Sequence, residues 1–593
     1  MRAIAFVPPK SGKGDRVKKP NLATMACFIF SFCAAASLRL GATDAFTKLV
    51  DLDGINNGVA PYMSLVQGLD GNLYGTTSAG GTYNGGTVFK ITPAGTLITI
   101  YDFCLQSKCA DGAIPLAGLV LASNGAFYGT TQEGGANGSG TVFKIMPSGT
   151  LTTLYSFCSQ KNCADGTVPN AGLVQATNGD FFGTTPAGGN LLCGGFGCGT
   201  VFKITPSGTL TTLYRFCSQS NCADGIGPYA GLVQATNGDF YGTTEFGGAN
   251  CTLRGGCGTV FKITPSGTLA TLYSFCPQGG GCADGSTPLA GLIQASNGSL
   301  YGTSSGGGDA NDGTVFKITP SGKLTTLYSF CSQANCADGA VPYYGGLIQA
   351  TDGNFYGTTL DGGANNNSGT IFQLTPSGTL TTLYNFCSQI NAQNVCTDGY
   401  YAAEGLVQDT NGKLYGSTVH GGANDDGTIF SLSAGLAPFV QTLPTSGKVG
   451  ASVYILGTNL TGASNVSFGG TSATFTVVSA TKIKTSVPGS PLTGSVTVTT
   501  PSGKLKSNKK FRVIPQITGL SLSSGPPTTV VTITGVSLTQ TAKVTFGGVA
   551  ATTFTVVNDT TVNATVPSGA ATGHIKITTP GGTATSPGVF TVT

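Results

Sequence analysis

The chain has no tryptophan and only two histidines, His420 and His574. Without tryptophan it cannot carry the Trp-Asp signature of WD repeats. Because one histidine lies in the last repeat and the other in the tail, the sequence gives no basis for nominating a Ser/His/Asp or Cys/His nucleophilic set. Charged residues make up 9 % of the sequence, and most carboxylates sit in Asn-Gly-like turns, so no glycosidase pair can be nominated. We therefore predict no catalytic residue, no metal site and no cofactor.

A few acidic residues stand out from this sparse background. Glu133, Glu245 and Glu404 depart from the surrounding pattern, and a solvated surface position is the expectation for each. Residues 309–313 and 424–427 are rich in Asp and Asn and weakly suggest calcium loops. Neither segment has the spacing or the terminal glutamate of an EF-hand, so calcium binding stays open.

Glycine is abundant instead, with 92 residues, and much of it lies in a unit that recurs between residues 46 and 433. In the copy at residues 199–241, short β-branched segments are separated by Asn-Gly and Thr-Pro-Ser-Gly turns, a pattern typical of a four-stranded meander. Seven copies contain an aromatic residue in the second strand and a phenylalanine in the third. The second-strand residues are Tyr74, Tyr128, Phe182, Tyr241, Tyr301, Tyr356 and Tyr415. The third-strand residues are Phe89, Phe143, Phe202, Phe261, Phe316, Phe372 and Phe430.

The fourth strand of the unit is displaced in one copy. Residues 46–52 resemble a fourth strand but precede the first complete unit, whereas the last unit ends after its third strand. A ring of units closed by its N-terminal strand leaves no exposed sheet edge. A linear solenoid would need capping units, and none is evident. The sequence thus predicts an all-β fold in which residues 43–435 form a seven-bladed β-propeller.

The N-terminal segment has the pattern of a secretory signal peptide. Residues 2–19 are basic, and the apolar stretch from Leu22 to Ala36 ends in small residues. We assign residues 1–42 to the signal and expect a secreted or outer-surface protein with no membrane anchor in the mature chain. A retained membrane anchor is the alternative, disfavoured because the apolar run is short for a spanning helix.

Charge is distributed unevenly along the mature chain. From Thr43 onward the net charge is −2, so nucleic acid is not an expected partner. Residues 43–435 carry a net charge of −11, and residues 436–593 carry +9 with a single carboxylate, Asp559. The two regions are therefore different modules.

Sixteen cysteines lie outside the leader, in eight pairs of near neighbours. An even number of locally paired cysteines behind a signal peptide indicates disulfides. Zinc is the competing interpretation, but each pair lies in a separate repeat or connection, away from a second half-site. The expected pairs are Cys104/Cys109, Cys158/Cys163, Cys193/Cys198, Cys217/Cys222, Cys251/Cys257, Cys276/Cys282, Cys331/Cys336 and Cys387/Cys396. All eight fall in connections that emerge at one face of the propeller.

The same face carries an Ala-Asp-Gly-x-x-Pro element that leads into the innermost strand of most units. Its acidic or amide residue is a candidate for a binding ring at the channel mouth, where loops on a rigid scaffold usually bind ligands. The alternative, which we favour, is an Asx turn before the strand. The residues are Asn57, Asp111, Asp165, Asp224, Asp284, Asp338 and Asp398.

A new pattern begins after residue 436 and occurs twice, in residues 437–513 and 515–593. Each segment has the size and alternation of an immunoglobulin-like β-sandwich. The shared elements V-x-I-x-G, V-x-F-G-G and V-T-x-T-P-x-G resemble IPT/TIG domains, which implies a spacer or attachment role. They are carried by Val453, Ile455, Gly457, Phe468, Gly469 and Gly470, and by Val531, Ile533, Gly535, Phe546, Gly547 and Gly548.

The repeats themselves resemble the choice-of-anchor GloVer tandem-repeat exported proteins. The resemblance covers about residues 46–433 and rests on GTVFKITPSGTLTTLYSF followed by DG-x-x-P-x-x-GL. It implies export rather than a particular reaction. The anchored members expected in this family end in a hydrophobic or sorting tail, whereas this sequence ends in a sandwich strand at residues 588–593.

Five basic residues are concentrated near the end of the first sandwich: Lys504, Lys506, Lys509, Lys510 and Arg512. They form a candidate attachment site for an anionic surface, although a solvated strand face is the more ordinary explanation. Taken together, the sequence favours a secreted or cell-surface, non-enzymatic binding or adhesion protein whose partner is an extracellular polysaccharide or a surface protein. A propeller enzyme acting on extracellular polysaccharide and a purely structural surface protein are the alternatives.

Overall fold

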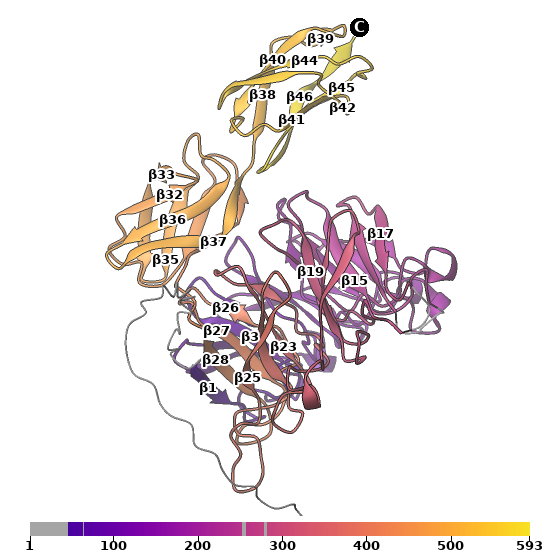
Figure 1. Ribbon diagram of the computed structural model, residues 1–593, viewed down its shortest axis with the longest axis vertical. Coiled ribbons are helices and arrows are strands. Elements are labelled where there is room, and N and C mark those ends of the chain that lie inside the picture. The colour runs from indigo at the N-terminus through magenta and orange to yellow at the C-terminus, as the bar shows by residue number, and fades with distance from the viewer. Residues whose placement is uncertain (1–44, 63, 252–256, 278–280) are drawn as a thin grey trace, which may run out of the picture. The chain divides into compact units, whose positions relative to one another are not determined.

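The computed structural model describes residues 45–593 apart from residues 63, 252–256 and 278–280. The expected signal peptide therefore lies outside the described residues. All regular elements in the described part are β-strands and short 3₁₀ turns, without an α-helix (Figure 1). Within these residues, no helix is both long and apolar enough to span a bilayer.

Seven four-stranded sheets follow one another along the repeats. The first consists of β2 (Val66–Gln67), β3 (Leu73–Thr77), β4 (Thr87–Ile91) and β5 (Leu97–Asp102), paired antiparallel in sequence order. The next five sheets repeat this order and are formed by β6 (Val120–Leu121), β7 (Phe127–Thr131), β8 (Thr141–Ile145), β9 (Leu151–Ser156); β10 (Val174–Gln175), β11 (Phe181–Thr185), β12 (Thr200–Ile204), β13 (Leu210–Arg215); β14 (Val233–Gln234), β15 (Phe240–Thr244), β16 (Thr259–Ile263), β17 (Leu269–Ser274); β18 (Ile293–Gln294), β19 (Leu300–Ser304), β20 (Thr314–Ile318), β21 (Leu324–Ser329); and β22 (Ile348–Gln349), β23 (Phe355–Thr359), β24 (Thr370–Leu374), β25 (Leu380–Asn385).

The seventh sheet is built from both ends of the array. Strands β26 (Val407–Gln408), β27 (Leu414–Thr418) and β28 (Thr428–Ser433) are completed by β1 (Ala45–Asp51), which pairs antiparallel with β28 from Ala45↔Ser433 to Asp51↔Thr428. The pairing predicted for residues 46–52 is therefore present. These repeated four-stranded sheets are consistent with a β-propeller.

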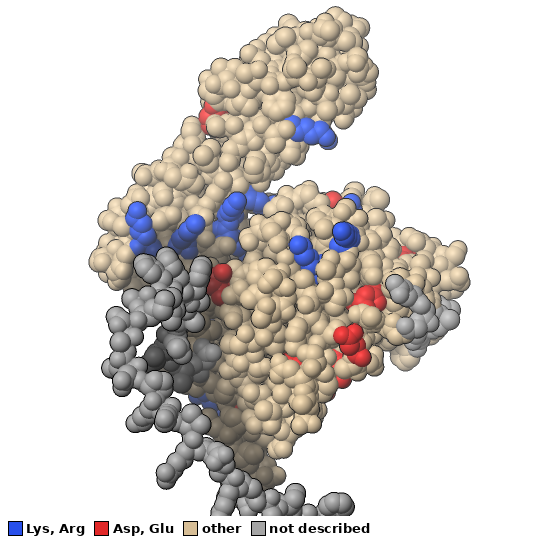
Figure 2. Space-filling view, viewed as in Figure 1, with Lys and Arg blue, Asp and Glu red and all other residues tan. Residues whose placement is uncertain are grey.

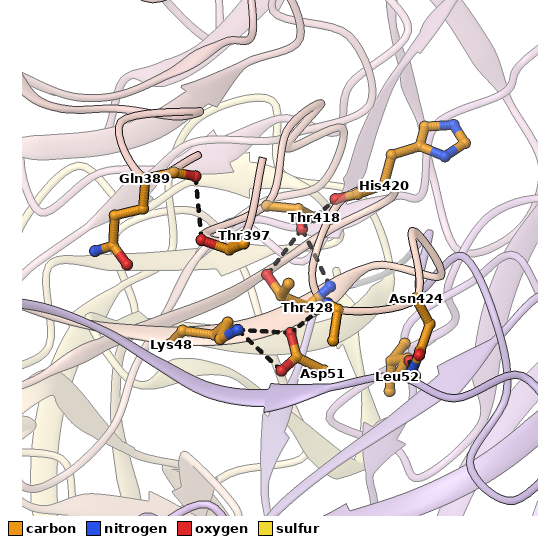
Figure 3. A network of polar contacts seen from close by, with 10 residues as sticks. Lys48, Asp51, Leu52, Gln389, Thr397, Thr418, His420, Asn424 and Thr428 are labelled. Atoms are coloured by element: carbon orange, nitrogen blue, oxygen red, sulfur yellow. Dashed lines mark hydrogen bonds and ion pairs between the residues drawn. The ribbon is translucent and has the colours of Figure 1, made fainter. Parts of the chain in front are cut away.

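Polar contacts hold β1 in the seventh sheet (Figure 3). Lys48 forms an ion pair of 2.8 Å with Asp51, and Asp51 accepts a hydrogen bond from the backbone of Ala423. Asn424 donates to the carbonyl of Leu52 at 2.8 Å. The N-terminal strand is thus joined to the last sheet by side chains as well as by its ladder.

The segments that precede the innermost strands meet in a closed ring. A Cβ built on Gly118 would lie 3.0 Å from the carbonyl oxygen of Ser64, and a Cβ on Gly172 would lie 3.2 Å from that of Gly118. The same relation continues to Gly405, where a Cβ would lie 2.9 Å from the Gly346 oxygen and 3.1 Å from the Ser64 hydroxyl. Larger side chains would separate neighbouring sheets here, so the ring requires small residues. Its members are Ser64, Gly118, Gly172, Gly231, Gly291, Gly346 and Gly405.

Aromatic rings pack neighbouring sheets together in place of tryptophan. Tyr74 and Phe127 have ring centroids 4.2 Å apart, and Tyr128 and Phe181 are 4.1 Å apart. All four rings are almost completely buried. At the closing sheet, Phe46 of β1 stacks on Tyr384 of the preceding sheet at 3.9 Å. Such pairs stabilise beyond the area they bury, by about 0.5–1.5 kcal/mol each.

Eight disulfides are present, and they join the eight pairs that the spacing predicts. They are Cys104–Cys109, Cys158–Cys163, Cys193–Cys198, Cys217–Cys222, Cys251–Cys257, Cys276–Cys282, Cys331–Cys336 and Cys387–Cys396. Five short 3₁₀ turns accompany them in the connections: η1 (Ser107–Cys109), η2 (Lys161–Cys163), η3 (Leu191–Cys193), η4 (Ser220–Cys222) and η5 (Ala334–Cys336). Local disulfides restrict these connections and are consistent with an oxidising, extracellular environment.

Six of the disulfides lie between the fourth strand of one unit and the first strand of the next. Two of these six differ from the other four. Cys282 is six residues from its partner and Cys396 is nine residues from its partner, whereas the other four separations are five residues. Neither Cys282 nor Cys396 lies in a 3₁₀ turn of the described residues, and both are partly exposed. A disulfide is therefore present in these two connections even though their lengths and local structures differ from those of the other four.

Two C-terminal β domains follow, each with one four-stranded and one five-stranded sheet. Apolar residues from both sheets of each domain form one buried core. The first domain contains β29 (Gln441–Leu443), β30 (Ser446–Gly447), β31 (Ser452–Leu456), β32 (Asn465–Phe468), β33 (Thr471–Ala473), β34 (Phe475–Ser479), β35 (Lys482–Ser486), β36 (Gly494–Thr500) and β37 (Gly503–Val513). The second contains β38 (Gln516–Leu520), β39 (Ser524–Gly525), β40 (Val530–Val536), β41 (Lys543–Phe546), β42 (Val549–Ala550), β43 (Phe554–Asn558), β44 (Thr561–Thr565), β45 (Gly573–Thr579) and β46 (Gly582–Val592).

Candidate functional site

The predicted ring of aspartates lies inside the connections rather than on a ligand-binding surface. Asp111, for example, is fully buried and accepts hydrogen bonds from the Tyr101 hydroxyl at 2.8 Å and from the backbone N–H groups of Leu105 and Gln106. Burial, followed by the hydrogen bond to Asp111, raises the pKa of Tyr101. The carboxylate oxygens are thus committed to the protein itself.

The other aspartates of this set repeat the arrangement. Asp165, Asp224, Asp338 and Asp398 are also 0 % exposed, and Asp284, partly exposed, still accepts from Tyr273. Asn57 accepts from the backbone of Asp53 at 2.8 Å. For the five fully buried aspartates the predicted binding role is corrected, because a buried carboxylate with several intramolecular donors has no free side for a ligand. For Asn57 and Asp284, which are partly exposed, it stays a prediction. The favoured Asx turn is also wrong in detail, since each aspartate bonds backwards to the tyrosine of the fourth strand and to backbone N–H groups at the start of its own connection.

The cysteines beside these aspartates have a structural role as well. The carbonyl of Cys282 accepts from the N–H groups of Gly285 at 2.9 Å and Gly308 at 2.8 Å, and the carbonyl of Cys396 accepts from two glycines in the same way. In each case the second glycine belongs to the connection between the second and third strands. The two kinds of connection are therefore bonded to each other at one face. The other cysteines with this pair of acceptor bonds are Cys109, Cys163, Cys222 and Cys336.

The competing zinc interpretation is not supported for the two irregular connections. The sulfur atoms of Cys282 and Cys396 are bonded to those of Cys276 and Cys387, so neither is available as a thiolate ligand. These cysteines hold the loop face together and offer no group to a ligand.

The repeats also differ from one another in the short segments before the innermost strands, which we call the axial segments. Their residues are 61–64, 115–118, 169–172, 228–231, 288–291, 342–346 and 402–405. In the regular units, a buried threonine of the second strand donates to a backbone carbonyl of the next axial segment. Thr130 donates to Ala171, and Thr184 donates to Ala230. This link ties each sheet to its neighbour close to the ring of small residues.

Two consecutive axial segments break that pattern. Asp338 and Leu347 are nine residues apart, whereas the equivalent residues of the other units are eight apart, so segment 342–346 contains one extra residue. The Thr303 hydroxyl, which would bond to this segment, is buried and has no hydrogen-bond partner among the described residues. In the next segment a glutamate, Glu404, replaces the small residue, and Thr358 donates to its backbone carbonyl at 2.7 Å.

The irregular segments bring tyrosines and a glutamate together, and we call Tyr62, Tyr229, Tyr343, Tyr344 and Glu404 the axial cluster. Tyr343 and Tyr344 contact edge to face, with ring centroids 4.3 Å apart. Burial, followed by the neighbouring Tyr343 and by the charges of Tyr229 and Glu404, raises the pKa of Tyr344. The pKa of Tyr62 is raised mainly by burial, with smaller contributions from the charges of Tyr343 and Glu404. The cluster therefore joins four units at the centre of the ring.

Glu404 is partly exposed. Burial raises the pKa of its carboxyl well above the usual value of 4.5, which favours the protonated form. Among the described residues, no cation forms an ion pair with it. A neutral carboxyl can donate as well as accept a hydrogen bond, which a polyhydroxylated ligand can use.

The three glutamates singled out in the sequence have different environments. Glu133 is exposed, as expected. Glu245 is partly buried, and burial raises its pKa to about 7. The expectation of a solvated position is thus wrong for Glu245 and Glu404. Aligning the seven axial segments residue by residue would have found Glu404, because the equivalent position is alanine in Ala117, Ala171, Ala230 and Ala290.

Aromatic side chains also gather elsewhere in the seventh unit. The ring of His420 stacks on Tyr400, with centroids 5.3 Å apart, and Tyr401 contacts both. In Figure 3 the imidazole points away from the Thr418–Thr428 hydroxyl pair. On the face shown in Figure 2, Lys, Arg, Asp and Glu cover only a small part of the surface.

The sequence of the repeats can be matched to a known family. The model of the Gloeobacter/Verrucomicrobia repeat matches residues 36–194, 104–282 and 252–478, which together cover most of the chain. The chain belongs to the Gloeobacter/Verrucomicrobia repeat family. Its C-terminal residues 515–592 match the IPT/TIG domain, so the sequence-based resemblances to both are confirmed there. Within this repeat-family protein, the IPT/TIG match covers the second C-terminal domain and not the first.

The Gloeobacter/Verrucomicrobia repeat protein matches no curated protein. Among solved structures, a fungal alcohol oxidase of the AA5 family in complex with copper has a TM-score of 0.45 and 13 % identity, over 79 % of this chain and 99 % of that one. The surface glycan-binding protein SGBP-B of Bacteroides uniformis has a TM-score of 0.14 and 24 % identity, over 26 % and 48 %. That of Prevotella bryantii has a TM-score of 0.21 and 18 % identity, over 25 % and 38 %. Likenesses this low identify neither a ligand nor an activity for the repeats.

Proposed function

We propose that this chain is a secreted or cell-surface, non-enzymatic protein that binds an extracellular polysaccharide at the axial cluster. The observation that carries the proposal is the contact between Tyr343 and Tyr344 in an axial segment with one extra residue, next in sequence order to the axial segment that carries Glu404. Tyrosine rings offer both an apolar face and a hydroxyl, which suits the mixed surface of a sugar. Convergent polar groups among aromatic side chains are typical of small-ligand sites on rigid scaffolds.

The proposal includes a specific architecture. Residues 43–435 are a seven-bladed propeller closed by β1, and residues 437–513 and 515–593 are immunoglobulin-like IPT/TIG modules that act as spacer or attachment. The ring of seven small residues and the β1–β28 pairing support the blade number. The shared strand order of the two C-terminal domains supports assigning the first domain to the same class. Residues 1–42 are the signal peptide that exports the chain.

The experiment is a screen of neutral and acidic glycans against the full secreted chain. We expect binding to be lost or weakened at least about ten-fold by Tyr343→Ala and by Tyr344→Ala, because each removes an aromatic contact of roughly 1–2 kcal/mol. Glu133→Gln, an exposed change in another unit, is the matched control and should bind like the parent. Unchanged binding by both tyrosine variants would place the site elsewhere.

A second candidate function is cleavage of the bound polysaccharide. The raised pKa of Glu404 favours it, since a carboxyl with a raised pKa can act as a general acid. Glycoside hydrolysis by two carboxylates also requires a partner at a suitable distance, and the structure does not identify one. Product analysis of the glycans that bind distinguishes the two functions. Release of shorter sugars that stops in Glu404→Gln would establish the enzyme instead of the binding protein.

A further inference from the structure

The five basic residues near the end of the first C-terminal domain lie on one strand, β37. Leu505, Ser507, Phe511 and Val513 of this strand are turned inward, with Phe511 and Val513 in the core. Lys504, Lys506, Lys509 and Lys510 are exposed, and Arg512 is partly exposed. At about 3.4 Å per residue, the row extends over about 27 Å.

A local irregularity increases the density of charge in this row. The ladder between β36 and β37 shifts between Ser495 and Thr497, and the Ser507 hydroxyl donates to the Lys509 carbonyl. The bulge leaves Lys509 and Lys510 exposed one after the other. A bulge changes the direction of the side chains beside it without ending the strand.

The second C-terminal domain supplies a natural comparison, because β46 is the equivalent strand. Both strands have eleven residues, the same shift in register and the same buried serine, Ser507 in β37 and Ser586 in β46. Yet β46 carries no charged residue. Its counterparts of the five basic residues are Thr583, Thr585, Gly588, Val589 and Thr591. The fold therefore does not require the charges of β37.

These charges are also left without partners inside their own domain. Residues 437–513 contain no aspartate or glutamate, and no ion pair of the described residues involves β37. Like charges on one strand face repel one another and weaken the folded state. An unpaired row that the fold does not need is therefore best explained by a ligand.

We propose that the exposed face of β37 binds a linear acidic polysaccharide and attaches the chain to an anionic surface. Alternate residues of a strand are about 6.8 Å apart, so the row presents single cations in one line, as a linear polymer with one carboxylate per sugar requires. Four of the five cations are lysines, which act as point charges rather than bidentate forks for phosphate. This surface is separate from the axial cluster and does not depend on its function.

A membrane and a nucleic acid fit this surface less well. No large apolar side chain of β37 is exposed, so nothing on the strand can enter the lipid boundary. Nucleic-acid binding typically uses arginine forks and aromatic stacking, whereas β37 has one arginine and its only aromatic ring, Phe511, is buried. Both polyanions are included in the test because they share the attraction to cations.

The test uses the full secreted chain and immobilised polygalacturonate at about 0.05 M and 1 M salt. The first variant, Lys504→Thr, Lys506→Thr, Lys509→Gly, Lys510→Thr and Arg512→Thr, gives β37 the uncharged character of β46. The matched control changes the other five basic residues of the two C-terminal domains, Lys448, Lys482, Lys484, Lys543 and Lys576, to Gln. Both variants thus have the same net charge.

We expect the β37 variant to bind about ten-fold or more weakly than the parent at low salt, while the control binds within about two-fold of it. The difference should vanish at 1 M salt, where the Debye length is about 3 Å. A five-residue Lys/Arg exchange that keeps every charge should bind like the parent. Equal binding by the β37 variant and the control overturns the proposal. Equal or tighter binding of the parent to anionic lipid vesicles or to duplex DNA overturns the assignment to polysaccharide.

Discussion

The seven units are alike where they pack against one another and different where they meet at the axis. In every unit a hydroxyl pair joins the second and third strands at 2.8–2.9 Å, as in Thr131–Thr141 and Ser304–Thr314. The axial segments instead range from the plain Ala117 and Gly118 to Tyr343, Tyr344 and Glu404. The comparison teaches that the recurring residues specify the fold and that the departures are where function is to be sought.

The irregular axial segments also lower the stability of the fold, which supports a role for them other than folding. A buried hydroxyl without a partner, as at Thr303, destabilises the folded state by about 1–3 kcal/mol. Burial also raises the pKa of Glu404, so its ionised form is disfavoured in the folded state. Such features persist where another requirement outweighs stability. Thr303 lies in the fifth unit and Glu404 in the axial segment of the seventh, on either side of the segment that carries the paired tyrosines.

We call the recurring strands and the contacts that pack the seven units together the framework. The largest effect should come from disrupting the framework where β1 pairs with β28. Deleting residues 45–51 removes β1, exposes the edge of β28 and uncovers the Phe46 contact with Tyr384. We expect the free energy of unfolding of the repeat array to fall by more than about 4 kcal/mol, measured by urea denaturation of the secreted chain. Lys48→Gln is the control, since a partly exposed ion pair contributes about 0–1 kcal/mol. A deletion variant as stable as the parent would contradict closure by β1.

The next largest effect should come from the buried aspartates, which belong to the framework despite their place in the loops. Asp224→Ala leaves the Tyr214 hydroxyl and the backbone N–H groups of Ser218 and Gln219 without their acceptor. We expect a loss of about 2–4 kcal/mol in the free energy of unfolding.

Asp180→Ala is the control for this prediction. Asp180 lies 3.9 Å from Lys203 in a turn, and its loss should cost less than about 1 kcal/mol. If Asp224→Ala instead weakened glycan binding while leaving stability unchanged, the predicted ring of binding residues would be restored.

The framework was predictable from sequence because the same unit recurs seven times. The turns, the alternation of strands and the displaced copy at residues 46–52 each constrain backbone geometry locally, and the cysteine pairs are close in sequence. The role of Asp111 was not predictable in the same way. An Asp-Gly pair indicates a turn, but only the structure shows that the carboxylate reaches back to Tyr101, ten residues earlier.

The axial cluster was missed for a different physical reason. Glu404 was taken to be solvated because an isolated glutamate usually is, and burial depends on neighbours contributed by other units. Tyr62 and Glu404 are more than 300 residues apart in sequence, and ring closure alone brings them together. Repeat patterns thus predict what the units share, whereas their differences acquire meaning only in the assembled ring.

A third prediction concerns the pH dependence of stability at the axis. Because the pKa of Glu404 is higher in the folded than in the unfolded chain, the folded state binds more protons once the pH exceeds about 4.5. The free energy of unfolding therefore falls as the pH rises from about 4.5 toward the folded pKa. Glu404→Gln removes this loss.

We expect Glu404→Gln to be more stable than the parent by about 1–2 kcal/mol at pH 8 and equally stable at pH 4, in urea denaturation at both pH values. Glu133→Gln, at an exposed position, should change stability at neither pH. A Glu404→Gln variant that is less stable at pH 8 would show that the carboxylate is charged and paired, and that this axial segment belongs to the framework after all.

The smallest effect concerns a link between neighbouring sheets that is polar in six cases and apolar in one. The glutamine of each innermost strand accepts a hydrogen bond from the turn of the preceding unit, as Gln234 does from the backbone of Thr177 at 3.2 Å. The equivalent glutamines are Gln67, Gln175, Gln294, Gln349 and Gln408. In the second unit the strand carries Leu121 instead, and the facing turn carries Leu69 where the others have serine or threonine.

We expect Gln234→Leu to lower the free energy of unfolding by about 1 kcal/mol, because it leaves the Thr177 N–H unpaired beside an apolar side chain. Leu121→Gln can recover the bond to the backbone of Leu69 but loses apolar contact with it, so it should change stability by less than about 0.5 kcal/mol. The double variant Leu69→Thr/Leu121→Gln would then recreate the polar link of the other six units and should be more stable than the sum of its single changes. The measurement is urea denaturation of the two single variants and the double variant. Additive effects would mean that the two leucines do not act as a pair and that the first and second units do not need a side-chain link at this position.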